Sequence, residues 1–313
     1  MHAQLLLSSL LLACSAVWAA DPMPIVTGNT IVHDLTLRIG GDRISASCLL
    51  QPGMDPHMYQ PVPVDVKKLA AAKLVIINGL GFEGWFEGLA KEAKFAGTLV
   101  VATTGLVPLK MKDDEHEHAG HAQTDKQEHA GHAKGADGLV DDPHAYNSIA
   151  NGTRYAENIR DALSAADPAG TESYRTRAAV VIEELRATDA WAKKQFASIP
   201  KPQRKIITNH DALQYFAKEY GFEILAPNTA LEDSQPSAQD IAALVQFIRT
   251  NGVKGVFLEF GKNQKVVEQV AKEAGVQVGA ELYLDGVGPA GGPAATYVGM
   301  FRANVEAIVT ALR

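Results

Sequence analysis

Residues 168–198 read PAGTESYRTRAAVVIEELRATDAWAKKQFAS, a run of strong helix formers with no glycine or proline after Gly170. As a single helix, about 30 residues would extend roughly 45 Å at 1.5 Å per residue. A helix of that length can join two lobes as a strut. The alternative is two ordinary helices that meet near Thr188 and Asp189. The stretch before it, residues 145–166, has the same helical character.

On both sides of this helical region, short apolar runs alternate with helical patterns. Before it, we expect strands at 44–50, 74–78 and 99–102 and helices at 64–72 and 85–93. After it, we expect strands at 205–208, 222–226, 255–260 and 276–282 and helices at 212–220, 238–251 and 262–275. Continuous β-branched runs are typical of parallel strands that are buried on both faces.

The predicted fold class is therefore α/β, with two (β/α) lobes that contain parallel sheets and are joined by a long rigid helix. We expect an N-terminal lobe at 21–166, a linking helix at 167–199 and a C-terminal lobe at 200–313. The formal net charge of −7 disfavours a nucleic-acid partner, because such proteins usually present a basic face.

The first 20 residues differ from the rest of the chain. Residues 5–13 are almost all Leu, Ser and Ala, and small residues precede Asp21. The apolar run is too short to span a bilayer as a helix, so it predicts a signal peptide at 1–20 and export to the periplasm. The run that ends at Cys14 also resembles a bacterial lipobox, so lipid anchoring through Cys14 is the alternative.

Residues 112–141 form a low-complexity segment in which the hexapeptide EHAGHA occurs twice, at 117–122 and 128–133. Five of the ten histidines lie here: His116, His118, His121, His129 and His132. With few apolar residues the segment cannot build a core, and a mobile loop is expected. Its histidines are candidates for weak, rapidly exchanging zinc sites, and the alternative is a solvated insertion without a role.

The stretch Gly79-Leu80-Gly81-Phe82-Glu83-Gly84 matches the glycine pattern of dinucleotide-binding proteins. That pattern needs an acidic residue about 20 positions later to hold the ribose, and the strand expected at 99–102 ends without one. We therefore expect these glycines to form a tight turn between a strand and a helix.

Three histidines outside the low-complexity segment lie next to the ends of expected strands or helices. His57 follows the strand expected at 44–50, His144 precedes a helix, and His210 ends the strand expected at 205–208. Ligands of open α/β sheets bind at the carboxyl ends of strands, so these positions can converge. Zinc favours four ligands, and Asp285 lies just past another expected strand. Three imidazoles and one carboxylate suit zinc better than magnesium or calcium.

The sequence resembles the zinc- and manganese-binding solute-binding proteins of bacterial ABC transporters, the ZnuA/TroA-like cluster. The segments that carry the resemblance are PGMDPHMYQP at 52–61, NGLGFEGW at 78–85, DPH at 142–144, NHDALQYF at 209–216, QPSA at 235–238 and GGPAATY at 291–297. The resemblance implies metal in a cleft between the lobes, capture for an ABC permease, and His57, His144, His210 and Asp285 as ligands. It assigns the first two to the N-terminal lobe and the last two to the C-terminal lobe.

The resemblance also bears on the metal. Manganese-type members carry a carboxylate where this chain has His210, and zinc-type members carry an acidic His-rich insertion, so zinc is expected. Within the cluster the chain looks closest to the AztC type, whose transport systems include a separate periplasmic zinc chaperone. A manganese- or iron(II)-binding protein is the alternative within the same class.

Two further features would support capture by a monomer whose lobes close over the metal. Residues 228–235 are polar and follow an expected strand, so they are a candidate flap. Glu259 ends another strand and is a candidate acceptor that orients a ligand imidazole. The rival class is a zinc hydrolase, but the sequence has neither a His-Glu-x-x-His motif nor a nucleophile elbow.

Overall fold

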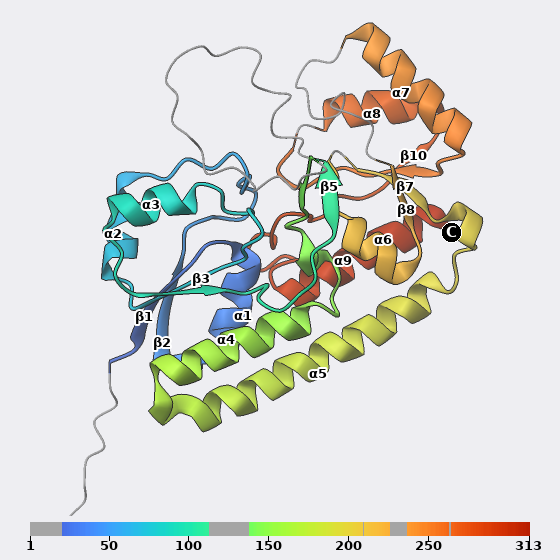
Figure 1. The fold of residues 1–313 in the computed structure, drawn as a ribbon. Coiled ribbons are helices and arrows are strands. Elements are labelled where there is room, and N and C mark those ends of the chain that lie inside the picture. The colour runs from blue at the N-terminus through green and yellow to red at the C-terminus, as the bar shows by residue number, and fades with distance from the viewer. Residues whose placement is uncertain (1–20, 113–137, 209, 226–236, 263) are drawn as a thin grey trace, which may run out of the picture.

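The computed structural model describes residues 21–112, 138–208, 210–225, 237–262 and 264–313. The predicted signal peptide with Cys14, the five histidines of the low-complexity segment and the candidate flap at 228–235 lie outside these ranges. The described chain forms two lobes, each built on a parallel four-stranded sheet (Figure 1). The predicted fold class is confirmed.

The N-terminal lobe contains a sheet in the order β2-β1-β3-β4, with all neighbours parallel. Its strands are β1 (Met23–Thr27), β2 (Ile44–Cys48), β3 (Leu74–Ile77) and β4 (Thr98–Val101), and its helices are α1 (Thr30–Gly40), α2 (Pro63–Ala71) and α3 (Phe86–Glu92). The sequence patterns named neither β1 nor α1. The side chain of Asn29 accepts hydrogen bonds from the amides of Ile31 and Val32, which starts α1 directly after β1.

The C-terminal lobe contains a second parallel sheet in the order β10-β9-β7-β8. Its strands are β7 (Lys205–Ile207), β8 (Glu223–Leu225), β9 (Gly255–Val256) and β10 (Gln277–Val278), and its helices are α6 (Gln214–Tyr220), α7 (Ala238–Asn251) and α8 (Lys265–Ala274). The strands expected at 255–260 and 276–282 are shorter than predicted, because these two segments of the chain stop pairing after β9 and β10. They pair once more at an isolated bridge between Glu259 and Leu282.

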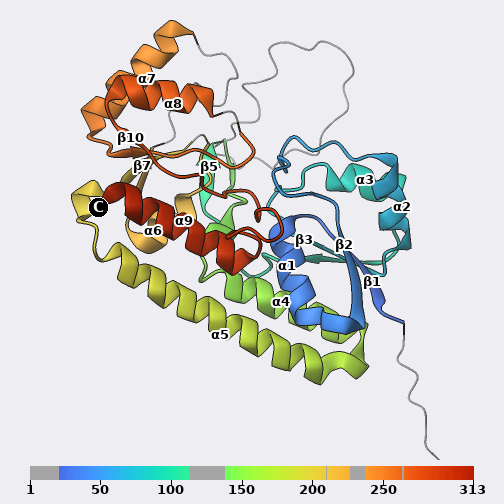
Figure 2. The same cartoon turned by 180° about the vertical axis from the view of Figure 1, so that it is seen from behind.

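Three helices run along the two lobes: α4 (Gly152–Ala166), α5 (Thr171–Phe196) and α9 (Tyr297–Leu312). At about 1.5 Å per residue, the 26 residues of α5 extend roughly 39 Å beneath both lobes (Figures 1 and 2). Helix α5 is continuous through Thr188 and Asp189, so the alternative of two broken helices is wrong. Helix α9, which the sequence patterns did not name, packs against α5.

The helix expected at 145–166 is only partly correct. Residues Ala145–Asn147 form a single 3₁₀ turn, η3, and α4 begins five residues later at Gly152. The side chain of Asn151 donates to the carbonyl of Ala145 at 3.0 Å, which closes the turn. The carbonyl of Tyr146 inside the turn also accepts from the hydroxyl of Tyr297 at 2.6 Å. Tertiary contacts therefore override helix propensity here.

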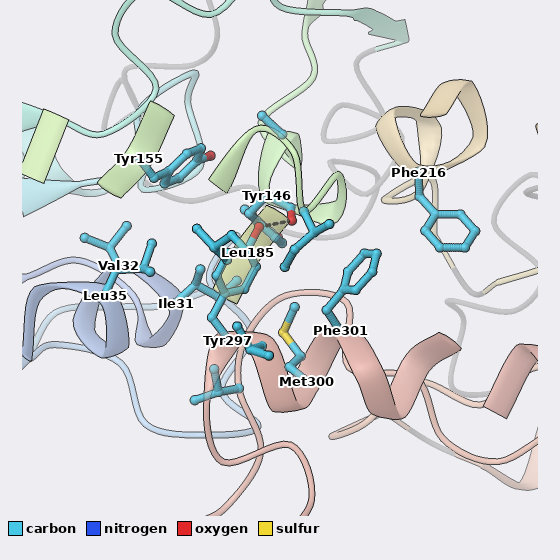
Figure 3. Close-up of a cluster of buried hydrophobic side chains, with 14 of the residues drawn as sticks. Ile31, Val32, Leu35, Tyr146, Tyr155, Leu185, Phe216, Tyr297, Met300 and Phe301 are labelled. Carbon is cyan, nitrogen blue, oxygen red and sulfur yellow. Dashed lines mark hydrogen bonds between the residues drawn. The ribbon is translucent and has the colours of Figure 1, made fainter. Parts of the chain in front are cut away.

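The largest hydrophobic core crosses both lobes. It gathers side chains from α1, α4, α5 and α9 and continues to Phe216 of α6 (Figure 3). Near its centre the hydroxyl of Tyr297 donates to the carbonyl of Tyr146 at 2.6 Å. Helix α5 is thus embedded in a shared core, which is a firmer connection than a free strut. Within the described ranges, no helix has both the length and the apolar character that a membrane span requires.

The ends of the predicted low-complexity loop are ordered as an antiparallel strand pair. Strand β5 (Lys110–Lys112) pairs with β6 (Leu139–Asp141), so residue 112 and residues 139–141 belong to strands and not to the loop. The reason is that Val140 is buried and anchors β6. The strand pair delivers the chain directly to Asp142 and His144.

The glycine-rich stretch at 79–84 forms the predicted turn between β3 and α3. Gly79 and Gly81 have φ of +87° and +83°, which glycine adopts at little cost. A Cβ at Gly79 would lie 2.3 Å from a methyl carbon of Val101. Conformation and close packing therefore explain these glycines without a nucleotide.

Candidate metal centre

The structure brings together the four residues that the sequence singled out. His57, His144, His210 and Asp285 each offer a ligand atom, and these atoms all lie within 4.8 Å of one another. His57 Nε2 is 3.2 Å from His144 Nε2, and His210 Nε2 is 3.3 Å from Asp285 Oδ1. The residues follow β2, β6, β7 and the Glu259–Leu282 bridge, respectively. The four residues therefore lie on the segments that follow these strands, at the interlobe cleft.

His144 is oriented by a carboxylate two residues before it. Asp142 Oδ1 lies 2.8 Å from His144 Nδ1 and also accepts from the backbone amide of His144 at 2.9 Å. Both side chains are buried. This contact places the Nδ1 proton toward Asp142, so that the lone pair of Nε2 faces the cluster.

Glu259 orients His210 in the same manner. Its Oε2 lies 2.8 Å from His210 Nδ1, and its Oε1 accepts from the backbone amide of His210 at 3.0 Å. Glu259 thus lies where a second-layer acceptor was expected. The Nε2 atom of His210 is buried and forms no well-aligned hydrogen bond with the described residues, although Asp285 Oδ1 lies 3.3 Å from it. A buried polar atom of this kind is uncommon without a ligand.

His57 lies on the loop after β2 and approaches the cluster from the other side. Its ring contacts Phe82 edge to face, with centroids 5.2 Å apart. The backbone amide of His57 donates to Asp55 Oδ1 at 2.9 Å, and the other oxygen of Asp55 forms an ion pair with Lys262. Because Lys262 belongs to the C-terminal lobe, this ion pair holds the His57 loop across the cleft.

Comparisons with known proteins show the family of this chain. The profile of the family described as "Zinc-uptake complex component A periplasmic" matches residues 25–311, nearly the whole chain. The chain belongs to this family. The family comprises metal-binding solute-binding proteins of ABC transporters, not enzymes.

Individual relatives have different metals in their names. The iron-binding protein YfeA of Yersinia pestis is 34% identical over 291 residues, which cover 92% of this chain and 86% of the relative. The manganese ABC transporter substrate-binding lipoprotein PsaA of Streptococcus pneumoniae is 30% identical over 313 residues, covering 96% and 94%. The periplasmic zinc-binding protein TroA of Treponema pallidum has a similar structure, with a TM-score of 0.77, 26% identity and coverage of 94% and 99%.

The charges of neighbouring groups and the burial of the site set the protonation states of the four candidate ligands. Burial alone would raise the pKa of Asp285, but the three histidines outweigh it and keep this pKa far below its ordinary value. Burial alone would lower the pKa of His210, but Asp285 and Glu259 raise it well above 6.5. Burial lowers the pKa of His57 to about 3. Without metal, the cluster therefore holds an ionised Asp285, a protonated His210 and a neutral His57.

A cavity of about 180 Å³ adjoins the cluster between the lobes. Its lining includes Asp55, Lys262, Phe260, Tyr283 and Asp285. One ligand, Asp285, therefore borders open space, which gives a hydrated ion room to approach.

Sequence reasoning missed two residues of the centre that the structure makes evident. Asp142 carries a recognisable signal, because it lies two residues before His144 in an Asp-Pro-His sequence like that of Asp55 and His57. Lys262 carries none, because its partner Asp55 is 207 residues away.

Proposed function

We propose that this protein captures zinc with high affinity and delivers it to an ABC permease for uptake. One observation carries the proposal: three imidazole nitrogens and one carboxylate oxygen converge within 4.8 Å. Four protein ligands in this number and type match a closed tetrahedral zinc site. A closed site leaves no position for a reacting water, which favours transport over hydrolysis.

The choice of zinc over manganese or iron(II) rests on the donor atoms. Imidazole suits zinc, whereas manganese favours oxygen ligands. Here nitrogen outnumbers oxygen three to one, and Glu259 orients His210 so that its Nε2 points to the other ligands. The names of YfeA and PsaA keep iron(II) and manganese as the alternative cargo.

A competition experiment with a matched variant tests the choice. Most nitrogen-rich sites bind zinc more tightly than manganese. The informative quantity is therefore the ratio of zinc affinity to manganese affinity, and the change of this ratio in His210→Glu. We expect the metal-free parent to select zinc, and the variant to lower the zinc-to-manganese selectivity at least about tenfold. Equilibrium dialysis against both metals, with metal analysis of the protein, measures the ratio. An unchanged ratio in His210→Glu, or manganese displacing zinc from the parent, would reject zinc as the cargo.

The remaining proposals concern organisation and partners. We propose an N-terminal lobe at 21–166, a linking helix at 167–199 and a C-terminal lobe at 200–313, and a monomer that acts in the periplasm after removal of residues 1–20. Lipid attachment at Cys14 is the alternative, which the lipoprotein relatives support. We further propose the AztC type, with a periplasmic zinc metallochaperone as a second partner.

We also propose that His116, His118, His121, His129 and His132 form auxiliary weak zinc sites. The tight site consists of residues at four strand ends elsewhere, so it does not need them. Deleting residues 113–136 is expected to remove the weakly bound zinc and to leave one tightly bound ion per chain, as measured by isothermal titration calorimetry. A variant of unchanged length with these five histidines replaced by asparagine separates the effect of the imidazoles from that of the loop length. Loss of the tight site in either variant would contradict this division.

A further inference from the structure

Asn147 connects three of the four ligand-bearing segments. It lies three residues after His144 and is 2% exposed. Its side-chain nitrogen donates to the carbonyl of Ala212 at 3.0 Å and to the carbonyl of Leu284 at 3.1 Å. Ala212 comes two residues after His210, and Leu284 directly precedes Asp285. One buried amide therefore fixes the spacing between the segments that carry these three ligands.

Other hydrogen bonds fasten the same segment to the C-terminal lobe. The hydroxyl of Tyr215 on α6 donates to the carbonyl of Asp142 at 2.9 Å. The hydroxyl of Tyr297 on α9 donates to the carbonyl of Tyr146 at 2.6 Å (Figure 3). Another bond joins Pro143 to the N-terminal lobe, since its carbonyl accepts from Asn78, the residue after β3, at 2.9 Å.

These contacts change the expected division of ligands between the lobes. By sequence position His144 belongs with His57, but its segment is also bound to the residues beside His210 and Asp285. The buried amide group of Asn147 has both hydrogens in use, and its loss would leave two buried carbonyls without their donor. Buried hydrogen bonds of this kind hold neighbouring segments in a single arrangement.

We propose that Asn147 is a positioning residue that holds His144, His210 and Asp285 as a preformed three-ligand half-site, which His57 completes. The proposal rests on the metal-capture function and specifies how that site is built. His57 arrives on the loop after β2, which the ion pair between Asp55 and Lys262 holds from across the cleft. Asn147 thus joins the segments of three ligands directly, whereas His57 lies on a separate loop.

Asn158 provides a matched control for Asn147→Ala in the full chain. It donates to the carbonyls of Ala102 and Thr104 at 2.8 and 2.9 Å, and these bonds join α4 to the end of β4, away from the ligand segments. We expect Asn147→Ala to lower zinc affinity about 10- to 100-fold, as is usual for groups that orient metal ligands. The visible absorption of the Co²⁺-loaded variant should also change, because it reports ligand geometry. Asn158→Ala should keep parental affinity and spectrum.

Parental affinity and an unaltered Co²⁺ spectrum in Asn147→Ala would overturn the proposal. Failure of the parent to bind one tight zinc would instead reject the metal-capture function. A measurement on the metal-free parent covers the case in which Asn147→Ala does not fold. Hydrogen–deuterium exchange should find the amides of 145–148 and 284–287 more protected than those of 57–58 before zinc is added. Equally fast exchange of all three segments without metal would overturn the half-site.

Discussion

Replacing His210 by alanine is expected to lower the zinc affinity of the protein by about 10²- to 10³-fold. Zinc sites built from protein ligands are held by about 10–16 kcal/mol, so one ligand of four contributes about 3–4 kcal/mol, and about 1.4 kcal/mol corresponds to a factor of ten. His210 should be at the upper end of this range, because its removal also leaves the carboxylate of Glu259 buried without its partner. Competition with a chelator of known affinity measures the change.

His33→Ala is the matched control for this substitution. His33 is also a partly buried histidine, but its Nδ1 lies 2.9 Å from the hydroxyl of Thr27 and it is not part of the four-residue cluster. This control should keep the parental zinc affinity. A His210→Ala protein that binds one zinc as tightly as the His33→Ala protein would show that the metal lies elsewhere.

Much of the fold was readable from the sequence because its signals are local. Strands β3 and β7 coincide with short apolar runs, and α5 coincides with a continuous run of strong helix formers. The prediction of a turn after β3 is also confirmed, because that turn depends on glycines whose backbone conformation is unusual. The errors concern places where distant contacts decide. At 145–151 the helix pattern continues, yet Tyr297 binds the carbonyl of Tyr146 and holds a turn there.

The residues of the candidate centre also divide into those that local sequence signals predict and those that only distant contacts identify. His57 and His210 could be selected because each follows an expected strand, and strand ends of parallel sheets meet at one edge. Glu259 could be proposed for the same reason. His144 could be selected because it follows Asp-Pro and precedes an expected helix. Asn147 could not, because its role exists only where the carbonyls of Ala212 and Leu284 face it. An asparagine in a helix-like stretch carries no mark of the segments that it will join.

Acid is expected to weaken zinc binding through His210. In the metal-free protein, Asp285 and Glu259 outweigh the effect of burial and raise the pKa of His210 well above 6.5, so this imidazole is protonated at neutral pH. A metal binds only the deprotonated nitrogen, and one proton must leave for each zinc bound. The pKa of His57 is lowered to about 3, so His57 releases no proton near neutrality. Below the raised pKa of His210, zinc affinity should fall about tenfold for each unit of pH.

Protonation of His210 has opposite effects on the stability of the metal-free fold and on zinc binding. A pKa above the unfolded value means that protonated His210 stabilises the metal-free fold below about pH 6.5, and this contribution is lost as the pH rises through the folded pKa. Zinc affinity rises as the pH rises through the same range. Bound zinc should therefore add most to the free energy of unfolding at the pH values where the metal-free protein has lost the contribution of His210. Calorimetric titration in buffers of different ionisation enthalpy counts the protons released at pH values below the raised pKa. The parent and His33→Ala should release one proton at His210, and His210→Ala should release one fewer. Equal counts in all three proteins would place the displaced proton elsewhere, and the charge balance among His210, Asp285 and Glu259 would then not control zinc release.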